Sequence, residues 1–200
     1  MAKIRLTKNE LKKQKDSLKM YRRYLPTLML KKQQLQGEIR ITDTRLKELQ
    51  IEINQLDESF KKWIAVFGET GIFTNDILKI TSIRTGHGNI AGVAIPVFEG
   101  ADFEIASYDL LQTPLWLDMA VENMKKALLL ELEADIVKEQ KKRLDKELRT
   151  TTQRVNLFEK IKIPEAKDNI KKIQVYLGDQ QTAAVVRGKI AKSGFEKAAK

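Results

Sequence analysis

Residues 11–60 read LKKQKDSLKM YRRYLPTLML KKQQLQGEIR ITDTRLKELQ IEINQLDESF, and this stretch decides the fold. Two interleaved series of mostly apolar residues recur in it, each with a period of seven. Lys, Arg, Gln and Glu fill the other faces, so the pattern predicts a narrow coiled-coil seam rather than a plain amphipathic surface helix. The series are Leu11, Leu18, Leu25, Lys32, Ile39, Leu46, Ile53, Phe60 and Phe67, and Tyr21, Leu28, Leu35, Thr42, Leu49, Leu56 and Trp63.

Several residues mark the ends and irregularities of this first helix. Thr7, with Glu10 three residues later, is typical of a helix-capping box. Pro26 lies inside the repeat, where proline removes a backbone donor and kinks a helix. The polar residues Lys32 and Thr42 stand at seam positions, where such residues commonly fix the register.

A second helical pattern begins near Pro114 and continues past Pro164, a second candidate for a kink. Its apolar stripe repeats every three or four residues, with a mean spacing slightly above 3.6. If residue 67 stands opposite about residue 114, Pro26 faces the neighbourhood of Val155, and the two prolines form a shared bend. After Gly178 we expect a tail that is frayed or weakly helical. The stripe comprises Leu117, Val121, Met124, Leu128, Leu132, Ile136, Gln140, Leu144, Leu148, Thr151, Val155, Phe158, Lys162, Ala166, Ile170, Ile173 and Leu177.

Between the two helical arms, Gly, Thr, Asn and Pro become frequent. Residues 77–85 and 90–98 favour β-structure and flank Gly86-His87-Gly88-Asn89, which predicts a hairpin with a glycine-rich turn. The predicted fold is therefore mainly α: a long antiparallel two-helix coiled-coil hairpin with a small β-hairpin-containing head. We expect three segments: residues 1–67, an N-terminal coiled-coil helix; residues 68–113, the head; and residues 114–200, a C-terminal coiled-coil helix and basic tail.

The net charge of +10 is distributed unevenly. Residues 1–40 carry +9, residues 41–113 carry −5, and residues 114–200 carry +6. If the chain folds back on itself, the basic ends form one pole, which can steer binding to an acidic protein or nucleic acid. The sequence has no cysteine, no signal-peptide pattern and no apolar run long enough to cross a bilayer, so cytoplasmic localisation is the expectation.

Residues that could carry chemistry are scarce. His87 is the one histidine, and we interpret it as a turn residue. The glycines near it lack the Gly-Lys-Ser or Gly-Lys-Thr ending of a phosphate-binding loop, and no paired carboxylates or nucleophile and base set is visible. We therefore expect no catalytic residue, no metal site and no cofactor.

Three ordered motifs carry a resemblance to a known family. They are Thr7, Glu10, Leu11, Lys15 and Leu18 near the N-terminus; Asn89-Ile90-Ala91-Gly92-Val93 with Pro96 and Phe98-Glu99 in the head; and Arg154-Val155-Asn156 with Glu159 and Ile163-Pro164 in the second arm. On these residues the chain resembles the D subunits of the rotary V-type and A-type ATPases. It departs from the family pattern at Pro26, Gln153 and Leu157, and in a tail less rich in lysine.

The resemblance implies a non-catalytic central rotor shaft that couples ATP hydrolysis or synthesis in a hexamer of A and B subunits to ion transport through a membrane ring. It also implies contacts with the small F subunit of the stalk and with a socket subunit above the membrane ring, and a peripheral position without membrane insertion. On this interpretation the cations of the basic pole contact the A/B ring: Lys3, Arg5, Lys8, Lys12, Lys13, Arg22, Arg23, Lys189 and Lys192.

A second group of residues is expected to shape the head and the family motif: Asn89, Ala91, Gly92, Val93, Pro96, Arg154, Val155, Asn156 and Pro164. The alternative function is a basic coiled-coil protein that binds nucleic acid or acts as an adaptor, although the basic ends lack interleaved surface aromatics. An enzyme is the third class considered.

Overall fold

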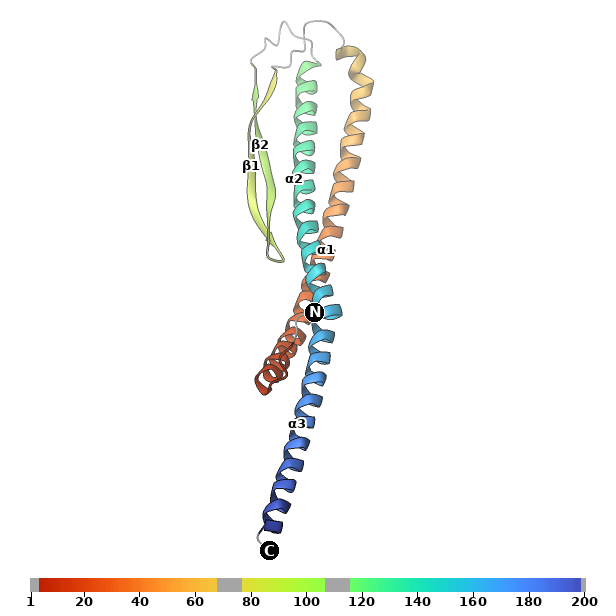
Figure 1. The fold of residues 1–200 in the computed structure, drawn as a ribbon. Coiled ribbons are helices and arrows are strands. Elements are labelled where there is room, and N and C mark those ends of the chain that lie inside the picture. The colour runs from red at the N-terminus through yellow and green to blue at the C-terminus, as the bar shows by residue number, and fades with distance from the viewer. Residues whose placement is uncertain (1–3, 68–76, 107–115, 199–200) are drawn as a thin grey trace. The chain divides into compact units, whose positions relative to one another are not determined.

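The computed structural model describes residues 4–67, 77–106 and 116–198. The elements follow in the order α1 (Lys8–Phe67), β1 (Leu78–Ile90), β2 (Val93–Ile105), α2 (Leu117–Asn156), the π-helical segment η1 (Leu157–Lys162) and α3 (Ile163–Ala198), as Figure 1 shows. A mainly α fold with a central β-hairpin is thereby confirmed. Pro114, the predicted start of the second arm, lies outside the described residues.

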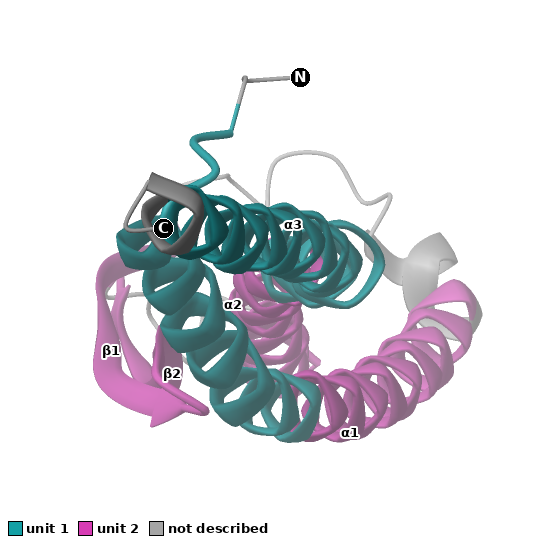
Figure 2. Cartoon of the chain, turned by 60° about the horizontal axis from the view of Figure 1, so that its bottom comes forward, with its two compact units in different colours: residues 1–31, 150–200 teal, residues 32–149 magenta. Residues whose placement is uncertain are grey.

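The chain divides into two compact units, coloured in Figure 2. Unit 1 contains Met1–Lys31 and Thr150–Lys200, and unit 2 contains Lys32–Arg149. The boundaries between the two units lie inside α1 and inside α2. The three segments expected from the sequence are instead consecutive along the chain, with boundaries between the helical arms and the head. Those segments stay a prediction.

Helix α1 confirms the heptad pattern. Every seam position from Leu11 to Phe60 is buried or half-buried, and the most enclosed are Leu35 and Leu49. The cap is also confirmed, because Thr7 Oγ1 accepts a hydrogen bond from the Glu10 backbone N–H at 3.3 Å. Pro26 lies inside α1 without ending it.

In unit 2 the first helix packs antiparallel to the second through two groups of apolar residues. Leu49 packs with Ala134 and Val137 in one, and Leu35 and Ile39 pack with Leu144 in the other. As the residue number rises along α1, that of its neighbours on α2 falls, which establishes the antiparallel arrangement in this unit.

The β-hairpin runs alongside α2 (Figure 1), and its turn differs from the predicted one. β1 and β2 pair antiparallel from Leu78↔Ile105 to Ile90↔Val93, so the turn residues are Ala91 and Gly92. The turn predicted at Gly86–Asn89 is wrong. These four residues belong to β1, and His87 pairs with Pro96.

The two glycines that suggested a turn have a packing role. A Cβ atom on Gly88 would lie 2.9 Å from Val97 Cγ2, and one on Gly86 would overlap the carboxylate of Glu99. Side chains from β2 therefore occupy the space above both glycines. Glycine inside a strand commonly marks such a close approach.

In unit 1, α2 continues through η1 into α3. The Ile163 backbone N–H donates to the Phe158 carbonyl, a bond that spans five residues and defines the π-turn. Pro164 follows directly and cannot donate a backbone hydrogen bond. The wider π-helical turn thus occupies the residues whose carbonyls would clash with the Pro164 ring in a regular α-helix.

The C-terminal part of α3 is helical as far as Ala198, which agrees with the weakly helical alternative for the tail and not with the frayed one. Every residue from Gly178 to Gly194 is exposed, including Val185 and Ile190. Good helix formers such as Ala183, Ala184 and Lys189 maintain the helix without packing against another element.

Candidate functional site

The tip of the hairpin is built by the motif Asn89-Ile90-Ala91-Gly92-Val93. Ala91 has a φ of 50° and Gly92 a φ of 79°, as a two-residue hairpin turn of the mirror-image type requires. The Asn89 side-chain oxygen accepts a hydrogen bond from the Gly92 backbone N–H at 2.9 Å. The motif therefore fixes the turn by its own local chemistry.

This tip packs against helices α1 and α2 in unit 2. Ile95 is 4% exposed and packs with Leu35 and Ile39 of α1 and with Leu144 of α2. Ile90, Ala91 and Val93 surround the same cluster. One hydrophobic cluster therefore joins α1, α2 and the hairpin.

Two hydrogen bonds from α2 to β2 add to this apolar packing, and they are called the polar attachment below. Gln140 Nε2 donates to the Pro96 carbonyl at 2.6 Å, and an Arg143 nitrogen donates to the Ala94 carbonyl at 3.4 Å. Both acceptors belong to β2, and both donors belong to α2. The sequence did not predict this attachment, although Gln140 was visible as a polar residue in the apolar stripe.

Replacing Gln140 by alanine should lower the free energy of unfolding by about 1–3 kcal/mol, because the part-buried Pro96 carbonyl loses its donor. Urea unfolding followed by circular dichroism measures the change. Gln34→Ala, at an exposed position on α1, is the matched control and should change the stability by less than about 0.5 kcal/mol. Equal effects of the two substitutions would contradict the attachment.

Two ion pairs link α1 to α2 on the surface of unit 2. Arg45 contacts Glu133 at 2.7 Å, and Lys141 contacts Asp43 at 2.6 Å. Hydrogen bonding to Glu133 raises the pKa of Arg45, and hydrogen bonding to Asp43 raises the pKa of Lys141. Because the charged groups remain partly exposed to solvent, which weakens their attraction, we assign these pairs to the register of the helices rather than to stability.

The cations expected at the basic pole lie in unit 1 as far as the structure describes them, and Lys3 lies outside the described residues. All of the described ones are exposed, so their charges face solvent. They come from both ends of the chain, and the fold brings the two ends into one compact unit. The described members are Arg5, Lys8, Lys12, Lys13, Arg22, Arg23, Lys189 and Lys192.

The motif of the second arm contains one buried residue and several exposed ones. Val155 is 4% exposed, whereas Arg154, Asn156 and Pro164 are more accessible to solvent. Close to it, the ring of Phe158 lies 5.2 Å from that of Tyr21. This contact agrees with the register expected from the sequence, which placed Pro26 opposite the neighbourhood of Val155.

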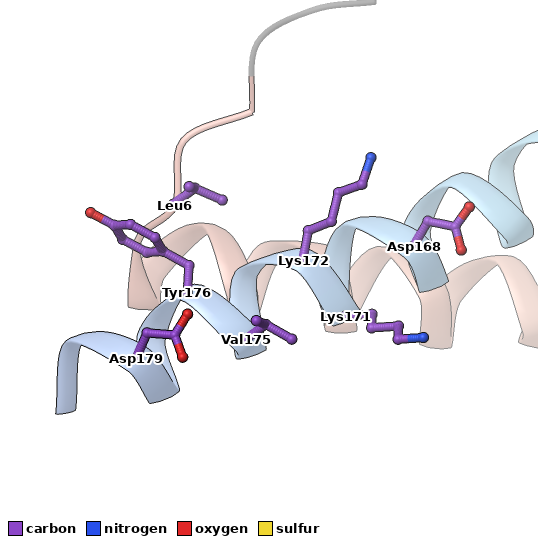
Figure 3. A pocket seen from close by; sticks show the side chains of 7 residues that line it. All are labelled: Leu6, Asp168, Lys171, Lys172, Val175, Tyr176 and Asp179. Carbon is purple, nitrogen blue, oxygen red and sulfur yellow. The ribbon is translucent and has the colours of Figure 1, made fainter. Parts of the chain in front are cut away.

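A surface hollow of about 660 Å³ lies between the residues preceding α1 and helix α3 in unit 1 (Figure 3). Leu6, Val175 and Tyr176 give it apolar walls. Charged groups of both signs border it, namely Lys171, Lys172, Asp168 and Asp179. Such a surface suits a protein side chain better than a reacting small molecule.

The described residues provide little for chemistry. Among them, no group of three or more His, Cys, Asp or Glu side chains is placed to hold a metal ion. No helix within residues 4–67, 77–106 or 116–198 is both long enough and apolar enough to cross a membrane. The fold and its surfaces thus define a class of mainly helical protein. In unit 2 the β-hairpin packs against two antiparallel helices, and the basic residues from both ends of the chain belong to unit 1.

Comparison with known proteins narrows this class. Residues 10–193 match the family of ATP synthase D subunits. The chain is 53% identical over 197 residues to the V-type ATP synthase D subunit of Borreliella burgdorferi, covering 98% of this chain and 97% of that protein. It is 37% identical to the V-type ATP synthase D subunit of Chlamydia pneumoniae, covering 96% and 93% of the two chains. The chain belongs to the family of ATP synthase D subunits.

Proposed function

We propose that this chain is the central rotor-shaft subunit of a V/A-type ATPase or ATP synthase. The match to the D-subunit family over residues 10–193 carries the proposal. The shaft couples ATP hydrolysis or synthesis in a ring of A and B subunits to ion transport through the membrane ring. It binds the small F subunit of the stalk and the socket subunit above the membrane ring, and it is a cytoplasmic protein held at the membrane by the complex.

The physical features of the chain suit torque transmission. Two helices joined by apolar clusters and cross-helix ion pairs resist separation in unit 2. In unit 1, exposed cations and the hollow beside Tyr176 offer the A/B ring both charge and apolar surface. Each change in the conformation of an A/B pair then favours a different angle of the shaft. The chain itself contributes no catalytic group and no cofactor.

Reconstitution tests this function directly. The chain is mixed with purified A and B subunits, the complex is isolated by size-exclusion chromatography, and its ATP turnover is compared with that of the A/B ring alone. We expect a stable complex in which turnover depends on the chain. Failure to form the complex, or turnover indifferent to the chain, would overturn the proposal.

Reversing two charges tests the basic contact. The double variant Arg22→Glu and Arg23→Glu should slow association with the A/B ring by about tenfold at low salt, because steering by opposite charges accelerates association. Stopped-flow mixing measures the rate. The control, Arg40→Glu with Lys47→Glu, makes the same change at exposed positions of α1 in unit 2 and should leave the rate nearly unchanged. An equal loss for both double variants would assign the effect to net charge alone.

A further inference from the structure

Four large apolar side chains of unit 1 are exposed near the ring contact between α1 and η1. Two of them come from α1 and two from η1, and each is between 40% and 54% exposed. Exposed apolar side chains that gather in one place commonly mark an interaction surface. The four residues are called the apolar patch below: Met20, Tyr24, Leu157 and Ile161.

The two helical arms of unit 1 run antiparallel at the patch. The rings of Tyr21 and Phe158 lie 5.2 Å apart. Leu6, nearer the N-terminus, lines the same hollow as Asp168 and Asp179. As the residue number falls along the first arm, that of its neighbours on the second arm rises, which establishes the antiparallel arrangement. Tyr21 and Phe158 mark the sides on which the two arms face each other.

All four patch residues lie on one side of this helix pair. In an α-helix, the residue one before a position and the residue three after it lie on the same flank of that position. The patch residues of α1 have this relation to Tyr21, and those of η1 have it to Phe158. An antiparallel pair is related by a two-fold axis perpendicular to the plane of the two helices, and this rotation keeps each flank on its own side. The wider turn of η1 leaves both of its residues on that flank.

The chain around the patch is strongly basic. Residues 12–31 contain seven Lys or Arg and one Asp or Glu, and residues 150–165 contain three and two. Unit 1 as a whole contains 21 Lys or Arg and seven Asp or Glu, whereas unit 2 contains 16 and 20. The positive charge of the protein is therefore concentrated in the unit that carries the patch.

Two exposed cations border the patch on its own side of the helix pair. Lys13 lies seven residues, or about two turns, before Met20, and Arg154 lies three residues before Leu157. Because the arms are antiparallel, the two cations lie toward opposite ends of the patch. At the Met20 end the surface contains a hollow of about 420 Å³, which can receive a side chain of a partner. Its lining residues are Asn9, Lys12, Lys13, Asp16, Ser17 and Met20.

We propose that the apolar patch binds an amphipathic helix of a partner subunit, with Asp and Glu beside the apolar stripe of that helix. Each arm offers two apolar side chains one turn apart, which match the spacing of such a stripe. The surrounding cations complement the acidic residues. Nucleic acid fits less well, because the centre of the site is apolar and Tyr24 is the one aromatic residue of the patch. A second copy would bring the same excess of cations to the contact. That the partner belongs to the motor rests on the proposed function.

Photo-cross-linking identifies the occupant directly. Tyr24 of the full chain is replaced by p-benzoylphenylalanine, the chain is co-expressed with the other motor subunits of its source, and the cross-linked peptide is sequenced by mass spectrometry. We expect one segment that carries apolar residues three or four apart and a net negative charge. The control places p-benzoylphenylalanine at Lys15, which is exposed on the opposite flank of α1, and should not capture that segment.

Two double variants test whether the patch contributes to affinity. Met20→Gln with Ile161→Gln should reduce the retention of the cross-linked subunit by the tagged chain about tenfold, because two apolar side chains are no longer buried in the contact. The control, Ile41→Gln with Ile51→Gln, makes the same change at exposed positions of α1 in unit 2 and should leave the retention unchanged. Both double variants should keep the urea midpoint of the wild-type chain, since all four positions are exposed.

The inference and the proposed function fail in different ways. A product cross-linked at Tyr24 that contains RNA, a second copy of this chain or a segment without net negative charge would overturn the inference, as would no cross-link at Tyr24. Equal retention by the two double variants would also overturn it. If the wild-type chain retains no motor subunit, the proposed function is wrong, and the product cross-linked at Tyr24 still decides the inference.

Discussion

Replacing Leu144 by alanine is expected to lower the free energy of unfolding by about 2–5 kcal/mol. The Leu144 side chain is fully buried and packs with Leu35 and Ile39 of α1 and with Ile95 of β2. The substitution leaves a cavity where α1, α2 and the hairpin meet, and relaxation of one element is limited by the other two. Urea unfolding of the purified chain, followed by circular dichroism at 222 nm, measures the loss.

A surface substitution of the same kind distinguishes this cavity from a general loss of apolar side chains. Ile41 is 64% exposed on α1, so Ile41→Ala should change the free energy of unfolding by less than about 0.5 kcal/mol. If Leu144→Ala were as mild as Ile41→Ala, Leu144 would not occupy the shared cluster. Tryptophan fluorescence, to which Trp63 and Trp116 both contribute, should report the same transition. Trp116 lies beside the buried Leu117 in unit 2.

In unit 1, Ile173→Ala should also destabilise the protein by about 2–5 kcal/mol, because Ile173 of α3 is fully buried. Val175 lies two residues further on and is 58% exposed, which makes Val175→Ala the matched control. Thermal unfolding followed by circular dichroism measures both variants. We expect a clear decrease in Tm for Ile173→Ala alone, and a similar decrease for both variants would contradict the buried position of Ile173.

The helical part of the fold could be predicted because its signal is local and repeated. In α1, one register accounts for every described seam position, and even the polar Thr42 is buried, with its hydroxyl donating to the Glu38 carbonyl at 2.8 Å. In the second arm, the stripe correctly included Leu144, Val155 and Ile173, but it missed Ala134 and Val137. The long apolar run before Ala134 fits more than one helical face, so periodicity alone cannot choose the buried one.

The presence of the β-hairpin could be predicted from the sequence, but the position of its turn and the pairing of its strands could not. Glycine is common both in turns and at close approaches between strands, and the sequence does not distinguish these uses at Gly86 and Gly88. The deciding features are the positive φ values at Ala91 and Gly92 and the side chains of β2 that cover the earlier glycines. The attachment of Gln140 to Pro96 was beyond prediction for the same reason, because it depends on which residues the correct turn brings to α2.

The π-helical segment before Pro164 has a consequence for the length of the chain. A bond from Ile163 to Phe158 encloses one residue more than an α-helical bond does. The segment between the buried residues Val155 and Ala166 therefore holds one surplus residue relative to an uninterrupted α-helix. Removal of one residue from this segment, together with replacement of Pro164, would therefore restore the α-helical bonding pattern without rotating the subsequent buried positions out of phase.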